Sequence, residues 1–320
     1  MPEPPSTTSN AEIARDGSPT RLREAPADRD LQRPGLRRSV AAHYDELTPY
    51  YAELWGEHIH HGLYETGAES RVEATEKLIR LVAEGCRIEP GARVLDVGCG
   101  LGGTSRWLSR NLGCRVIGLT ISEVQAGMAR DRSQRGRLHA GEAATPRCFA
   151  DAAPSPRFLV ADAAYLPLRG RFDAVLAIEV LSHVGDRGGF FRDAAGVLAP
   201  GGRIGIAAWL KASDLSTAAE RRCIAPIEAG MLVSLPTREE YERHLAARGL
   251  RLESYRDISA EVARTWDLCL ELIRDRALWR VARQRGPDVV AFLGSFRAMR
   301  RGFASGAFRY AVLHAEKPAA

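Results

Sequence analysis

The segment from residue 93 to residue 112 constrains the fold more than any other part of the chain. It begins with an apolar run, 93–97, whose length and β-branched content are typical of a buried strand. A glycine cluster at 98–103 follows directly, and an amphipathic segment follows at 104–112. Glycines allow positive φ and close approach of the backbone to a ligand, and the first N–H groups of a helix point toward that ligand. The pattern predicts a strand, a tight turn and a helix, with a polar ligand at the turn.

The spacing of the glycines leaves two ligand classes open. Three of them fit the GxGxxG pattern of dinucleotide-binding proteins, which also requires an acid at the end of the second strand, about 20 residues on. The second predicted strand, 115–120, ends without one. We interpret Glu123 as part of a capping box that starts at Thr120 and opens the next helix. An NAD-dependent oxidoreductase is therefore the less favoured class. That interpretation also gives no role to Asp96, which lies two residues before the first glycine.

The string Val-Leu-Asp-Val-Gly-Cys-Gly at 94–100 resembles the first motif of class I S-adenosylmethionine-dependent methyltransferases. The resemblance implies that Asp96 lies near the methionine end of the cofactor and that Gly98 and Gly100 admit the cofactor beside the backbone. It also implies S-adenosyl-L-methionine as the cofactor.

Two later stretches agree with this resemblance in order and spacing. Phe-Leu-Val-Ala-Asp-Ala at 158–163 resembles the third strand of the family, which implies that Asp162 faces the adenine amino group, with Ala163 beside it. Leu-Ala-Pro-Gly-Gly-Arg-Ile at 198–204 resembles the turn before the fifth strand. The implied fold class is α/β, with a doubly wound, seven-stranded Rossmann-like methyltransferase sheet.

Aromatic and histidine residues crowd into residues 36–64, ahead of the first strand, and predict a cover over a pocket. The string Trp-Gly-Glu-His-Ile-His-His-Gly-Leu-Tyr at 55–64 is similar to the segment before the cofactor domain in tocopherol methyltransferases and some alkaloid N-methyltransferases. The His-Tyr-Asp string at 43–45 is more distantly similar to sterol C-methyltransferases and cyclopropane fatty-acid synthases. This branch implies that Tyr44, Thr120 and Gln125 bind the cofactor.

The chain divides into four predicted regions. Residues 1–36 are expected to be a disordered tail because they are rich in Pro, Ser, Thr and charge. A helical cover is expected at 37–90, the cofactor core at 91–210, and the completion of the sheet with a helical substrate lid at 211–320. A surface insertion without assigned function is expected at 136–157. Further strands are predicted at 172–179, 204–209, 252–258 and 308–314, with apolar residues at helical spacing before the last of them.

Composition excludes several classes of protein. The formal net charge is +5, but acids nearly balance bases and no long basic run occurs, so we predict no nucleic-acid partner. The six cysteines form no CxxC pair, which indicates neither a zinc ribbon nor a disulfide framework and favours a reducing, cytoplasmic setting. His58, His60 and His61 lack a second spaced group of ligands, so no metal is predicted. No stretch reaches transmembrane length, which predicts no stable membrane insertion.

Methyl transfer from a sulfonium is an in-line displacement, so the enzyme must align the acceptor, exclude water and leave a competent nucleophile. His183, just after the fourth strand, is the predicted catalytic base for a hydroxyl, with His60 and His61 as second choices. Glu179, at the end of that strand, could also act as a base, but the resemblance implies that it faces the cofactor. The predicted substrate is a small hydrophobic metabolite, such as a phenolic or prenylated natural product. Six residues are assigned to substrate binding: Tyr51, Trp55, His60, His61, Trp209 and Trp266.

Two other functions stay open at this point. Methylation of carbon or nitrogen on a prenyl, sterol-like or alkaloid acceptor would use an aromatic wall and would not require His183 as a base. A protein that binds the cofactor but has lost methyl transfer could use the same pocket to fold or cyclise a substrate. Incorporation of a methyl group into the product distinguishes a methyltransferase from such a protein.

Overall fold

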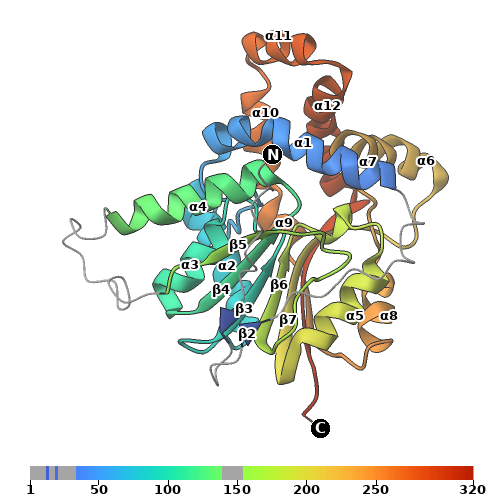
Figure 1. The fold of residues 1–320 in the computed structure, drawn as a ribbon. Coiled ribbons are helices and arrows are strands. Elements are labelled where there is room, and N and C mark those ends of the chain that lie inside the picture. Colours follow the sequence, from blue (N-terminus) through green and yellow to red (C-terminus); the bar gives the residue numbers. More distant parts are fainter. Residues whose placement is uncertain (1–11, 14–18, 21–33, 139–153, 320) are drawn as a thin grey trace, which may run out of the picture.

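The computed structural model describes residues 12–13, 19–20, 34–138 and 154–319. Its centre is a seven-stranded sheet in the order β5-β4-β3-β6-β7-β9-β8 (Figure 1). The five strands from β5 to β7 are parallel, and β9 runs antiparallel to both β7 and β8. The predicted doubly wound methyltransferase sheet is confirmed. The strands are β3 (Arg93–Val97), β4 (Arg115–Thr120), β5 (Arg157–Val160), β6 (Phe172–Ile178), β7 (Leu198–Lys211), β8 (Arg251–Asp257) and β9 (Phe308–Glu316).

Helices cover both faces of the sheet, which is why its central strands are almost continuously apolar. Successive side chains of a strand point to opposite faces. Val94 accordingly packs in one apolar cluster with α2 and α3, whereas Leu95 packs in a second cluster with α5 and α8. These helices are α2 (Arg71–Gly85), α3 (Gly103–Leu112), α5 (Arg187–Val197) and α8 (Arg238–Ala246).

A helical cap lies over the carboxyl ends of the parallel strands. The first helix, α1, packs beside α4 and belongs to the same apolar cluster as α7, α10 and α12; Figure 1 shows α11 farthest from the sheet. The cap therefore combines α1 and α4 with helices from the last third of the chain. The roles of these segments as cover and substrate lid stay predictions. Its elements are α1 (Pro34–Trp55), α4 (Glu123–Leu138), α6 (Thr217–Ala219), the π-helix η3 (Glu220–Ile224), α7 (Ala225–Met231), α9 (Ser259–Val262), α10 (Arg264–Leu272), α11 (Arg276–Arg285) and α12 (Pro287–Ser305).

Two predicted regions fall largely outside the described residues, namely most of the tail at 1–36 and most of the insertion at 136–157. Within the tail, β1 (Glu12–Ile13) pairs antiparallel with β2 (Pro19–Thr20), and α1 begins at Pro34. Among the described residues, no helix combines the length and the apolar content needed to cross a bilayer.

The predicted capping box from Thr120 to Glu123 is wrong. Helix α4 begins at Glu123, and the residue before it, Ser122, caps it by accepting a hydrogen bond from the Gln125 backbone N–H at 3.0 Å. The Thr120 hydroxyl instead donates to Gln125 Oε1 at 2.6 Å. The chain turns after β4, so the residue with the right backbone position for capping is two places later than the sequence pattern indicated.

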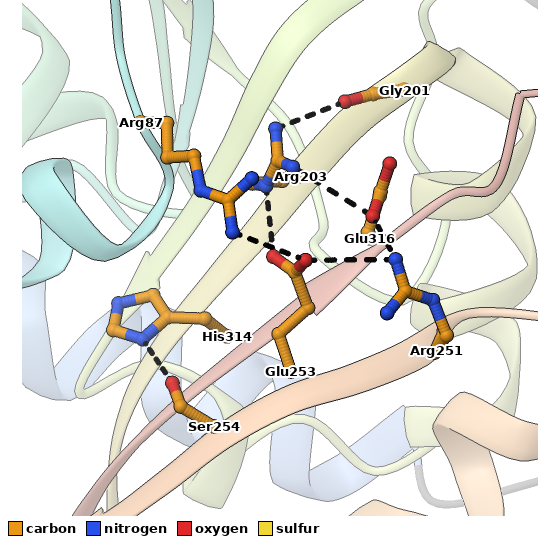
Figure 2. A network of polar contacts seen from close by, with 8 residues as sticks. All are labelled: Arg87, Gly201, Arg203, Arg251, Glu253, Ser254, His314 and Glu316. Carbon is orange, nitrogen blue, oxygen red and sulfur yellow. Dashed lines mark hydrogen bonds and ion pairs between the residues drawn. The ribbon is translucent and has the colours of Figure 1, made fainter.

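An ion-pair network fastens the antiparallel end of the sheet (Figure 2). Glu253 on β8 accepts from Arg203 on β7 at 2.8 Å, and Glu316 on β9 pairs with both Arg203 and Arg251. The contact with Glu253 raises the pKa of Arg203. Because each carboxylate serves arginines from different strands, the network holds β7, β8 and β9 in register.

Candidate active site

Two adjoining cavities lie at the carboxyl ends of the parallel strands, where ligands gather in sheets of this kind. The first, here called the glycine-loop cavity, is lined by Gly98, Gly100, Thr120, Gln125, Asp162 and Ala163 among others. The second, here called the aromatic cavity, is lined by Tyr51, Trp55, His60, His61, Trp209 and Trp266 together with Phe292 and Phe296. Four residues line both: Tyr44, Ile59, Glu179 and His183. The predicted cofactor and substrate groups are thus brought side by side.

The glycine loop shapes the first cavity through two left-handed residues. Gly98 has φ +75°, and a Cβ there would lie 2.5 Å from the Val180 side chain. Gly100 has φ +53°, and a Cβ there would meet nothing within 4 Å. Glycine at 98 is therefore required for packing of the loop on the chain after β6, whereas Gly100 leaves open space beside the backbone for a ligand.

Polar groups from the end of β4, the start of α4 and the chain after β5 also line this cavity. Thr120 and Gln125 are joined by the 2.6 Å hydrogen bond described above, and both are buried. Asp162 follows β5, and its Oδ1 accepts from the Ala164 backbone N–H at 2.9 Å. All three residues line the glycine-loop cavity, and their contacts with a cofactor stay a prediction. The structure offers a hydroxyl–amide pair where a dinucleotide site would have an acid.

Asp96 is buried near the end of β3. It is 2% exposed and lines neither cavity, and its Oδ2 accepts from the Ser105 hydroxyl at 2.6 Å. Burial raises the pKa of Asp96 to about 6, against the hydrogen bond from Ser105, which lowers it. The carboxyl group therefore ties the end of β3 to the first turn of α3, and its contact with the cofactor remains a prediction.

Glu179 holds the cover onto the core. It is a non-glycine residue at φ +55°, a strained conformation that proteins keep mostly at functional sites. Its Oε1 accepts from the His61 backbone N–H at 2.6 Å, from His61 Nδ1 at 2.9 Å and from the Tyr310 hydroxyl at 2.8 Å. Although burial opposes it, these contacts with His61 lower the pKa of Glu179. The predicted cofactor residue thus directs its carboxylate toward the cover, while its side chain lines both cavities.

His183 sits in the short 3₁₀-helix η2 (Leu181–His183) after β6. Its Nδ1 lies 3.2 Å from the Leu232 carbonyl, which can only accept, so Nδ1 carries a proton. Its Nε2 is then the acceptor for the Tyr44 hydroxyl at 3.1 Å. Burial lowers the pKa of His183 to about 4 and raises that of Tyr44 well above its ordinary value. The two rings form a neutral hydrogen-bonded pair at the junction of the two cavities.

Leu232 is one of the residues that reasoning from sequence missed. It has φ +53° at the end of α7, and this conformation presents its carbonyl to His183. Tyr310 on β9 was missed as well, because its alternation with core residues resembles that of any strand position. Phe292 and Phe296 lie in the predicted lid, but helical periodicity could not show which face of α12 points to the cavity.

The predicted aromatic residues gather into one wall. The Tyr44 and Tyr51 rings lie 6.1 Å apart, and those of Trp209 and Trp266 lie 6.4 Å apart. Trp55 contacts both Tyr51 and the α12 side of the cavity. Among the described residues, no group of His, Cys, Asp and Glu side chains has the arrangement of a metal site.

Comparison with known proteins agrees with this geometry. The family model described as "Methyltransferase domain" matches residues 95–206. Tocopherol O-methyltransferase from Arabidopsis thaliana is 30% identical over 308 residues, covering 88% of this chain and 83% of that protein. The 27-O-demethylrifamycin SV methyltransferase from Amycolatopsis mediterranei is 32% identical over 282 residues, covering 86% and 95% respectively.

A solved structure shows the same fold. The [4+2]-cyclase SpnF superposes with a TM-score of 0.73 at 26% identity, covering 89% of this chain and 97% of that one. Both of these methyltransferases are at least 30% identical to this chain and cover more than four-fifths of it. The chain belongs to the class I S-adenosylmethionine-dependent methyltransferases and is an enzyme that methylates a small metabolite.

Proposed function

We propose that this enzyme methylates a hydroxyl group of a small, largely apolar acceptor, such as a phenolic or prenylated natural product. The observation that carries the proposal is the Tyr44–His183 pair, which lines both cavities and so lies where a methyl donor and an acceptor would meet. The aromatic side chains around the second cavity favour an acceptor with a large apolar surface.

The residues of the glycine-loop cavity fit the cofactor. Gly100 leaves the backbone open to it, and Gly98 lets the loop pack beside it. Thr120 and Gln125 would lie along its ribose side, and Asp162 with Ala163 would receive the adenine. S-adenosyl-L-methionine supplies the methyl group as an electrophilic carbon on a sulfonium.

The remaining chemistry falls to side chains of the chain itself. The Tyr44 hydroxyl donates to His183 Nε2, so its oxygen can accept the proton of an acceptor hydroxyl. As the new oxygen–carbon bond forms, that proton becomes strongly acidic and passes to Tyr44, while the Tyr44 proton passes to His183. The high pKa of Tyr44 keeps it neutral before and after the transfer. A neutral imidazole with a low pKa is a sufficient base, because the proton that it receives is leaving a much stronger acid.

The names of two relatives support oxygen as the acceptor atom, since one is a tocopherol O-methyltransferase and the other acts on a 27-O-demethyl compound. The rival is methylation of carbon or nitrogen, as in the sterol 24-C-methyltransferase of Schizosaccharomyces pombe, 28% identical over 192 residues. An aromatic wall of Tyr44, Tyr51, Trp209 and Trp266 is also suited to a cationic intermediate.

Replacing His183 with alanine separates the two. A panel of phenols, prenyl alcohols and amines is first screened with methyl-labelled cofactor to find an acceptor. For a hydroxyl acceptor we expect His183→Ala to lower kcat by about 100-fold or more, the ordinary contribution of a general base. Affinity for S-adenosylhomocysteine should change little, which controls for folding. Unchanged turnover would refute the base role and favour the rival.

A further inference from the structure

Three buried nitrogen atoms around the aromatic cavity have no hydrogen-bond partner in the described part of the chain: Trp266 Nε1, His60 Nε2 and His61 Nε2. Trp266 is 4% exposed and His61 is 2% exposed, so bulk water does not satisfy them. A buried polar atom left unpaired destabilises the folded state, and such atoms are rare in folded proteins. Three such atoms on residues that line one cavity therefore indicate a bound group that pairs with them.

The neighbours of these atoms define what that group must offer. Trp266 Nε1 can only donate. His60 Nδ1 lies 2.9 Å from the His61 carbonyl and must donate to it, while burial lowers the pKa of His60 and keeps the ring neutral. His60 Nε2 can then only accept. The complementary group both accepts and donates a hydrogen bond. A hydroxyl does so, whereas a ketone or an ether only accepts and an ammonium only donates.

The subsite lies away from the reacting atoms. None of Trp266, His60 and His61 lines the glycine-loop cavity, whereas Tyr44 and His183 line both cavities. The oxygen that receives the methyl group must be at that junction. A hydroxyl that pairs with Trp266 and His60 is therefore a different group of the acceptor.

We propose that the aromatic cavity contains a polar subsite, formed by Trp266 Nε1 and the Nε2 atoms of His60 and His61, that binds a second hydroxyl of the acceptor. The inference rests on the proposed function, which supplies the first hydroxyl. It narrows the substrate class to compounds with two hydroxyl groups on one compact apolar frame, and dihydroxybenzenes are the simplest of these.

Calorimetric titration tests the subsite without requiring methyl transfer. The full-length enzyme, saturated with S-adenosylhomocysteine and kept under argon, is titrated with phenol and separately with hydroquinone, resorcinol and catechol. One hydrogen-bonding subsite corresponds to about a tenfold change in affinity, so the best dihydroxybenzene should bind about ten times more tightly than phenol. Trp266→Phe, which keeps an aromatic ring and removes the N–H, should reduce this ratio to about threefold or less.

Phe296→Leu is the matched control, because it alters the same wall without removing a polar atom. We expect it to weaken phenol and the dihydroxybenzene by the same factor, so that their ratio stays as in the wild type. Unchanged affinity for S-adenosylhomocysteine shows that each variant is folded. Three results would overturn the subsite. The wild type could bind phenol and every dihydroxybenzene with equal affinity, or it could bind none of them. Alternatively, the ratio of the dihydroxybenzene affinity to the phenol affinity could stay unchanged in Trp266→Phe. A ratio that behaves as expected in an enzyme that methylates none of these compounds would refute the proposed hydroxyl methylation and leave the subsite standing.

Discussion

Replacing Asp96 with asparagine should remove a pH-dependent loss of stability that is built into the cofactor loop. Asp96 is buried at the end of β3 and accepts a hydrogen bond from the Ser105 hydroxyl. Its pKa rises from an ordinary value of 3.8 to about 6 in the folded protein. Since each pH unit of difference between the folded and unfolded pKa corresponds to about 1.4 kcal/mol, ionised Asp96 lowers the free energy of unfolding by about 3 kcal/mol.

The direction of the pH dependence follows from the higher pKa of the folded state. Between pH 4 and 6 the folded protein keeps a proton on Asp96 that the unfolded chain has released. Stability from this group is complete below about pH 4 and is lost as the pH rises to about 6. Asparagine does not titrate. The unfolding free energy of Asp96→Asn minus that of the wild type should therefore increase by about 2 kcal/mol from pH 4.5 to 7.5.

Urea unfolding followed by tryptophan fluorescence, with both proteins measured at the same series of pH values, checks this difference. Subtracting one protein from the other cancels the remaining titrating groups. Ser105→Ala is an internal control, because it removes the hydrogen bond that lowers the pKa of Asp96 and should move the loss of stability to higher pH. A difference that stays constant within about 0.5 kcal/mol over this range, where linkage predicts about 2 kcal/mol, would refute the reasoning.

Three further outcomes are expected. Gly98→Ala should abolish S-adenosylhomocysteine binding, because the new methyl group would lie 2.5 Å from a side chain after β6. As a control, Gly91→Ala, also at positive φ but in open space, should cost only about 1 kcal/mol of strain and leave binding intact. Equal binding by the two variants would contradict this prediction. Tyr310→Phe should lower the free energy of unfolding by about 2 kcal/mol at pH 7, since it removes a buried hydrogen bond to the Glu179 carboxylate, and a loss below about 0.5 kcal/mol in thermal or urea unfolding would argue against that bond. Because the pKa of His183 is about 4, kcat/KM for a hydroxyl acceptor should not fall through protonation of this residue as the pH is lowered from 8 to 6. A decline in kcat/KM centred near pH 6.5 that disappears in His183→Ala would show instead that the imidazole has its ordinary pKa.

The sheet and the cofactor class were predictable because their determinants are local. A buried parallel strand is a short apolar run, and the turn after β3 needs glycine at positions such as Gly98 that the backbone places at positive φ. The capping prediction at Thr120 failed for a related reason. Whether Thr120 or Ser122 lies at the cap depends on where the chain turns after β4, which the spacing of residues does not state.

The contacts that define the site were decided by tertiary structure. The Glu179 carboxylate meets His61, 118 residues earlier, and Tyr310, 131 residues later; Tyr44 meets His183 across 139 residues. A pattern of residue types can nominate Glu179 and His183, because both follow a predicted strand. It cannot show that the Glu179 carboxylate accepts hydrogen bonds from His61 and Tyr310, or that a tyrosine hydroxyl donates a hydrogen bond to the His183 imidazole.

The sequence by itself indicated the fold and the cofactor through its resemblance to a known family, and the type and spacing of neighbouring residues nominated Glu179 and His183 at the carboxyl end of a strand. Only the tertiary structure decided which atoms face one another, which ring nitrogens are left without a partner, and how far burial moves each pKa. These properties depend on hydrogen-bond geometry and on removal from water, and both arise when distant segments pack together.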